Sequence, residues 1–64
     1  MKTYWFWDVD SDCLIDDTFK GTEKEARKKA IQYAKKYRVI VNVEEAITGR
    51  DIATVDEYGN DVYL

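Results

Sequence analysis

Residues 21–37, GTEKEARKKAIQYAKKY, decide the fold class because they contain a complete signal for the start of an α-helix. Thr22 can accept a hydrogen bond from the backbone N–H three residues on, while the Glu25 side chain reaches back to the Thr22 N–H, a reciprocal pair known as a capping box. Positions with helical spacing then follow at Ala26, Ala30, Tyr33, Ala34 and Tyr37. We predict a helix from Thr22 to about Tyr37, whose small alanine side chains allow a close approach to a sheet.

The segment before this helix has the composition of a β-hairpin. Residues 3–9, TYWFWDV, are aromatic and β-branched and predict a strand. Asp10-Ser11-Asp12 favours a turn, so residues 13–19 are expected to return as a second strand. This second strand alternates weakly between two faces. One face has Cys13, Ile15 and Phe19, and the opposite face has Leu14, Asp16 and Thr18.

The segment after the helix predicts further strands. Residues 39–43, VIVNV, are β-branched and too short for a second helix, so they are expected to form the central strand. Alternation gives this strand one face made of Val39, Val41, Val43 and Ile47. Thr48-Gly49-Arg50 favours a turn before a strand at 51–56, and residues 58–61 favour a hairpin turn before a short strand at 62–64.

These elements predict one α+β domain over residues 1–64, with a single α-helix packed on one face of an antiparallel β-sheet of four to five strands in the order ββαββ(β). A chain of about 60 residues buries only about 60% of its unfolded surface, so the core is small. Cys13 is the only cysteine and no histidine is present, which excludes an intramolecular disulfide and argues against zinc. The unpaired thiol, together with the lack of a long apolar stretch or a signal segment, predicts a cytoplasmic protein without a membrane span.

Charge is distributed unevenly along the chain. The segment 22–38 has seven basic residues against two acidic ones, a net +5, whereas the rest has three basic and eleven acidic residues, a net −8. Helical geometry places the lysines opposite the alanine stripe, and the candidate anion-contacting residues on this basic face are Lys24, Arg27, Lys28 and Lys35. The face is expected either to be a solvated surface, to attract the acidic strands of its own chain, or to bind an anionic partner.

Alternation in the first strand separates its aromatic residues into two pairs. Trp5 and Trp7 face one way, while Tyr4 and Phe6 face the other way together with Asp8. Because the Tyr4/Phe6 side soon becomes acidic, we predict that Trp5 and Trp7 pack against the helix and that Tyr4 and Phe6 lie near the open face of the sheet.

Two interpretations of an open Tyr4/Phe6 pair remain. The pair either packs across strands, for example against Ile40 or Tyr63, or forms a contact surface for a protein or a second copy of the chain. Stacking of single-stranded bases is opposed by the repulsion between phosphates and the neighbouring Asp8 and Asp10.

The residues give no support to enzymatic chemistry. No histidine can act as a base, and the three glycines form no phosphate-binding loop. Asp8-Val9-Asp10 resembles the first motif of haloacid-dehalogenase-type phosphotransferases, but those enzymes need a far larger domain for their other catalytic residues. Residues 8–19 resemble the start of a calcium loop, yet they lack the glycine and the glutamate that such a loop requires. We therefore expect no catalytic residue, no metal ligand and no cofactor.

The sequence thus favours a non-enzymatic interaction domain that binds another protein. In size, acidity and element order the chain resembles small accessory proteins of phages and mobile elements. The candidate protein-contacting residues are Tyr4, Phe6, Asp8 and Asp10. Three alternatives stay open. The first is a nucleic-acid-binding accessory protein that uses the basic helix face, although the pI near 4.8 argues against it. The others are an acidic inhibitor that occupies a nucleic-acid site on a host enzyme, and a homodimer.

Overall fold

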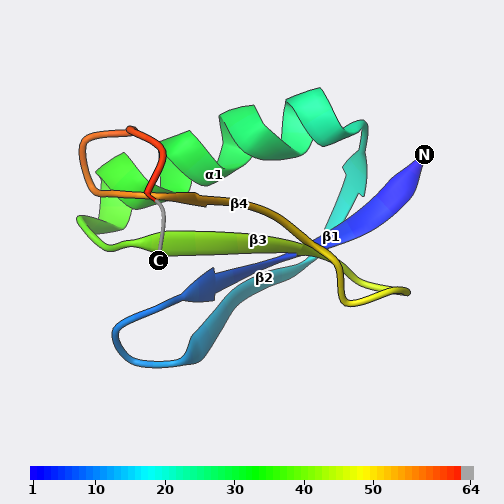
Figure 1. Cartoon of the computed structure of the whole chain (residues 1–64), viewed down its shortest axis with the longest axis horizontal. Helices are drawn as coiled ribbons and strands as arrows, with labels where there is room; N and C mark the ends of the chain where they lie inside the picture. Colours follow the sequence, from blue (N-terminus) through cyan, green and yellow to red (C-terminus); the bar gives the residue numbers. More distant parts are fainter. Residues whose placement is uncertain (63–64) are drawn as a thin grey trace.

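The computed structural model describes residues 1–62 and has the predicted α+β class. Its elements are β1 (Lys2–Asp8), β2 (Cys13–Gly21), α1 (Glu23–Tyr37), β3 (Val41–Glu45) and β4 (Asp51–Val55). The strands form one antiparallel sheet in the order β2-β1-β3-β4, so β3 is a central strand as predicted, together with β1. Helix α1 runs along one face of this sheet, and the β1–β2 hairpin extends away from it (Figure 1). Within residues 1–62, no helix has both the length and the apolar character needed to cross a membrane.

The predicted capping box starts α1. Thr22 Oγ1 accepts a hydrogen bond from the Glu25 N–H at 3.2 Å, and Glu25 Oε1 accepts one from the Thr22 N–H at 2.9 Å. The backbone N–H of Thr22, and after it the Thr22 side chain, stabilise the ionised Glu25 carboxylate and lower its pKa. The helix ends at Arg38, which adopts the left-handed conformation (φ 56°) and donates its N–H to the Ala34 carbonyl oxygen. The local sequence therefore accounts for the start of this element.

The core lies between α1 and the sheet. The helix contributes the three alanines of the predicted stripe, all fully buried: Ala26, Ala30 and Ala34. The sheet contributes Tyr4, Phe6, Val41, Val43, Ile52 and Val55. The Phe6 ring makes edge-to-face contacts with Phe19 and Tyr33, with centroid distances of 5.5 and 5.3 Å. This aromatic cluster fills the space beside the small helix residues.

The predicted orientation of β1 is wrong. Tyr4 is 2% exposed and Phe6 is fully buried, so both side chains point toward α1 and not to the open face. Phe6 lies directly opposite Val43 in the β1–β3 pairing, while Trp7 lies opposite Asn42. Because paired residues share a face, Phe6 joins the buried valines of β3 and Trp7 points to the uncovered side.

The physical reason for this orientation lies in the polar atom of tryptophan. An indole N–H that is buried without an acceptor costs free energy, and the helix-facing side of the sheet offers mainly alanine and valine side chains. On the open face, Trp7 Nε1 donates to Glu44 Oε1 at 2.8 Å. Strand alternation then places the rings of Tyr4 and Phe6 in the core.

Strand β2 also departs from simple alternation. Phe6 pairs with Asp16 and Trp7 pairs with Leu14, so Ile15 is an extra residue that bulges from the ladder. Asp16 thereby lies on the helix side, contrary to the predicted separation from Ile15, and its Oδ2 accepts a hydrogen bond from Tyr33 Oη at 2.7 Å. Burial and this contact raise the pKa of Tyr33 to about 12. The pair ties the edge strand to α1.

The chain after β3 follows the predicted turns with one exception. Ile47 is 90% exposed and does not share a strand face with Val41 and Val43, because the chain turns immediately after Glu45, whose carbonyl oxygen accepts from the Gly49 N–H at 2.8 Å. After β4, the Gly59 N–H donates to the Asp56 carbonyl oxygen at 2.9 Å, and Val62 N–H donates to Thr54 at 2.8 Å. Tyr63 and Leu64, the end of the predicted strand at 62–64, lie outside the described residues.

Candidate functional site

The sheet face that α1 does not cover is the main candidate for a functional surface. We call it the tryptophan face and define it by Trp5, Trp7, Leu14, Asn42 and Glu44. The two indole rings are half-buried, and their centroids lie 6.3 Å apart with a tilt of 60°. Leu14 pairs with Trp7 across the β1–β2 ladder and is 41% exposed. Neighbouring strands thus position an aromatic and apolar surface on the side opposite the helix.

Polar contacts hold this face in one arrangement. The Trp7 indole N–H bonds to the Glu44 carboxylate on the next strand. Asn42 Nδ2 donates to Thr54 Oγ1 at 3.0 Å, which connects β3 to β4. Side chains that are fixed in this way lose little conformational freedom when a partner binds.

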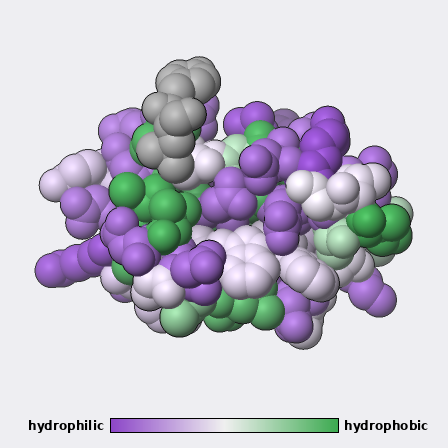
Figure 2. Space-filling model, turned by 60° about the horizontal axis from the view of Figure 1, so that its bottom comes forward, coloured by the Kyte–Doolittle hydropathy of each residue, from purple (hydrophilic) through white to green (hydrophobic). Residues whose placement is uncertain are grey.

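A hollow of about 350 Å³ opens beside Trp7 on the same face. Its lining combines an aromatic ring, an aliphatic side chain, an amide and two carboxylates, from Trp7, Val9, Asn42, Asp12 and Glu44. Seen from the side away from α1, the surface has separate hydrophobic areas between hydrophilic ones and is not one continuous apolar patch (Figure 2). Reversible protein interfaces are, as a whole, about as apolar as the rest of a protein surface, so the mixture by itself does not distinguish this face.

The four predicted protein-contacting residues lie in different environments. Tyr4 and Phe6 are in the core and cannot contact a partner. The Asp8 carboxylate accepts hydrogen bonds from the N–H groups of Asp10 (3.0 Å) and Ser11 (3.3 Å), so it stabilises the β1–β2 turn. Asp10 is exposed within that turn. Sequence reasoning placed the tryptophans against the helix; the contact of Trp7 with Glu44 on the open face joins residues 37 positions apart and has no local signal.

One of the four predicted residues of the basic helix face also makes contacts within the chain. Lys24, Lys28 and Lys35 are exposed, as the helical geometry predicts. Arg27, however, donates from Nη2 to the Ile52 carbonyl oxygen at 3.2 Å, and its Nη1 lies 4.0 Å from Asp61 Oδ1. This arginine therefore contacts strand β4, and its side chain is still 46% exposed.

Comparison of the chain with protein families, curated proteins and solved structures gives no match.

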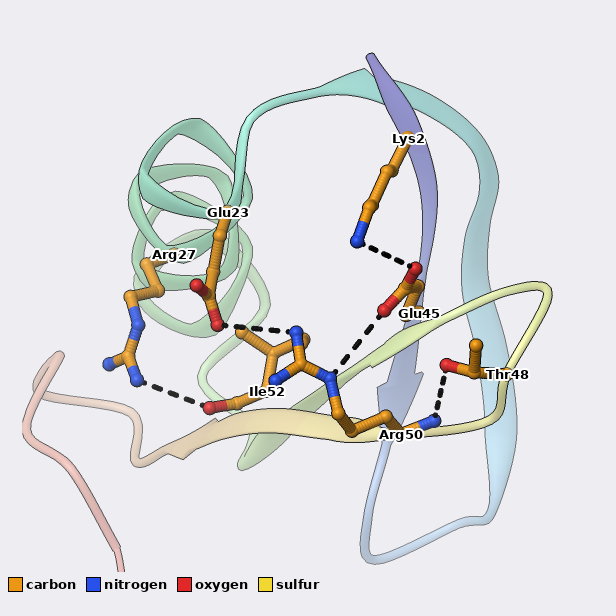
Figure 3. A network of polar contacts seen from close by, with 7 residues as sticks. All are labelled: Lys2, Glu23, Arg27, Glu45, Thr48, Arg50 and Ile52. Carbon is orange, nitrogen blue, oxygen red and sulfur yellow. Dashed lines mark hydrogen bonds and ion pairs between the residues drawn. The ribbon is translucent and has the colours of Figure 1, made fainter.

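A second polar cluster surrounds Glu45, whose side chain is only 9% exposed (Figure 3). Lys2 Nζ lies 3.2 Å from Glu45 Oε1 and Arg50 Nε lies 3.5 Å from Oε2. Arg50 also reaches Glu23 at 3.8 Å, so the cluster joins β1, β3, the loop before β4 and the start of α1. The pKa of the Glu45 carboxyl is lowered, chiefly by the hydrogen bond from Lys2. Burial acts in the opposite direction, but it is outweighed by this bond together with the Thr48 hydrogen bond and the charge of Arg50. The positive charges of Lys2 and Arg50 compensate the negative charge of the Glu45 carboxylate. We therefore infer that this cluster stabilises the fold.

This assignment predicts a pH dependence. A depressed carboxyl pKa stabilises the fold above the unfolded value of 4.5, and that stability is lost as the pH falls through the lower folded value. We expect Glu45→Gln to be less stable than the original chain at pH 7, with the difference shrinking toward pH 3. Urea unfolding at pH 7 and at pH 3 measures this difference in the free energy of unfolding. Glu57→Gln removes the same charge at an exposed position and should not change the free energy of unfolding at either pH. An unchanged difference at pH 3 would contradict the ionic role.

Proposed function

We propose that this chain is a non-enzymatic interaction domain that binds a basic segment of another protein through the tryptophan face. The observation that supports this most is the position of Trp5 and Trp7 on the sheet face that α1 leaves uncovered. Tryptophan is enriched among the residues that dominate binding energy, because a rigid ring removes a large apolar area from water on association.

The charge distribution supports a basic partner. Glu44 lies within the tryptophan face, and Asp10 and Asp12 lie in the adjacent turn. Outside the segment 22–38 the chain has a net charge of −8, which would accelerate the encounter with a positively charged surface and repel an acidic one. An enzyme whose nucleic-acid site is basic is one partner of this kind. A cytoplasmic location is part of the proposal, in keeping with the exposed thiol of Cys13.

Selection of peptides from a displayed random library tests the proposal. We expect the selected peptides to be rich in arginine, lysine and aromatic residues. Trp5→Ala and Trp7→Ala should each weaken their binding by about 30-fold, the equivalent of about 2 kcal/mol, because truncated interface tryptophans have effects of this size. Far-ultraviolet circular dichroism verifies that both variants remain folded.

The matched control is the double variant Lys28→Glu with Lys35→Glu, which alters the opposite side of the molecule and should leave binding intact. Acidic peptides whose binding depends on these lysines would overturn the proposal in favour of the basic helix face. A mass in light scattering that doubles with concentration, and that Trp5→Ala returns to the monomer value, would instead identify a second copy as the occupant.

A further inference from the structure

We infer that the hollow beside Trp7 binds an arginine side chain of the partner, which makes arginine the residue that the domain selects. The inference rests on the proposed function and specifies its ligand. It concerns the five lining residues Trp7, Val9, Asp12, Asn42 and Glu44.

The lining matches the chemistry of a guanidinium group. A planar cation is attracted to the face of an indole ring, and Trp7 provides that ring. Guanidinium N–H groups bind carboxylates in a fork geometry, and Asp12 and Glu44 provide two carboxylates from different parts of the chain. Val9 adds an apolar surface for the aliphatic part of the arginine side chain.

The acceptors are fixed before any ligand arrives. Glu44 Oε1 accepts from Trp7 Nε1 at 2.8 Å, which holds the carboxylate at the edge of the ring and leaves Oε2 as the second acceptor. Asn42 uses its Nδ2 on Thr54 at 3.0 Å, so its Oδ1 is the acceptor that this amide offers. An arrangement that is already held by the sheet needs little reorganisation to bind a cation.

Size and charge select among occupants. A hollow of about 350 Å³ accommodates one long side chain and no folded element. The two carboxylates repel phosphate and acidic side chains. Lysine would meet the same charges, but its compact ammonium group neither stacks on the ring as a plane nor donates in two parallel directions. Arginine therefore satisfies more of the lining than any other residue.

Nuclear magnetic resonance titration of the full chain tests this inference, with N-acetyl-arginine methylamide as the probe. We expect a saturable shift of the Trp7 indole N–H signal. The citrulline analogue, which has the same shape without the charge, should bind about tenfold more weakly, and the lysine analogue should also bind more weakly than arginine. Equal shifts with all three probes, or stronger binding of lysine, would overturn the inference.

Two charge-matched variants separate the hollow from general attraction. Glu44→Gln retains an acceptor for the Trp7 indole N–H but loses the charge, and it should weaken binding of the arginine probe by about three- to tenfold. Glu57→Gln, in the loop after β4, should leave binding unchanged. Equal weakening by both variants would overturn the inference. If selected peptides still require Trp5 and Trp7 but are indifferent to arginine, the inference fails while the proposed function stands; if they do not require the tryptophans, both fail.

Discussion

Replacing Phe6 with alanine is expected to unfold the chain at room temperature, whereas replacing Trp5 or Trp7 leaves it folded. Phe6 is fully buried and its ring contacts Phe19 and Tyr33, so truncation should cost about 3–5 kcal/mol. A single core of this size supplies only about 3–5 kcal/mol in total. The half-buried tryptophans lose less contact, and we expect about 1 kcal/mol for each.

Circular dichroism and urea unfolding of the three variants measure this difference. A stable Phe6→Ala variant combined with an unfolded Trp7→Ala variant would show that the tryptophans face the helix, and would remove the basis for the tryptophan face. The comparison also determines which variants are suitable for binding experiments.

Replacing Ala30 with leucine is expected to destabilise the fold strongly. Ala30 is fully buried between α1 and the sheet, where its methyl group permits the close approach of the two layers. A larger side chain must displace its neighbours, at a cost of about 1–3 kcal/mol. In a domain of this size that cost lowers Tm by roughly 5 to 20 °C.

Gln32→Leu is the matched control, because residue 32 lies exposed on the same helix. Leucine is a good helix former, so this variant should keep the Tm of the original chain within a few degrees. Equal Tm values for the Ala30 and Gln32 variants would contradict close packing of the helix on the sheet.

The parts of the fold that the sequence predicted are those determined by local interactions. The capping box of Thr22 and Glu25 connects residues only three apart, and turn-forming residues mark the ends of the strands. These signals are independent of the rest of the chain. They were sufficient for the α+β class, for one helix and for the order of the elements.

The orientation of β1 could not be predicted in the same way. Alternation separates Trp5 and Trp7 from Tyr4 and Phe6 but does not state which pair is buried. The deciding interactions join distant residues: Phe6 opposite Val43, and Trp7 bonded to Glu44, which is 37 residues away. The acidity of the neighbouring turn, on which the prediction relied, reflects the hydrogen bonds of that turn.

The candidate site was predicted only in part for the same reason. The charge asymmetry and the exposed lysines follow from helical geometry and from counting. Alternation does not reveal which strands pair or where a bulge occurs. The contact of Arg27 with the Ile52 carbonyl oxygen depends on strand pairing, and the hydrogen bond of Asp16 with Tyr33 depends on the bulge in β2. Tertiary contacts therefore moved the proposed contact surface from Tyr4 and Phe6 to the tryptophans.

The central claim is that the tryptophan face binds a basic protein segment. The chain has two tryptophans, so a proton–nitrogen correlation spectrum of the labelled protein has two indole N–H signals. During titration with a peptide selected from the library, we predict that both signals shift together with the amides of β1 and β3. Stationary indole signals, with shifts confined to helix amides between Lys24 and Lys35, would contradict the claim.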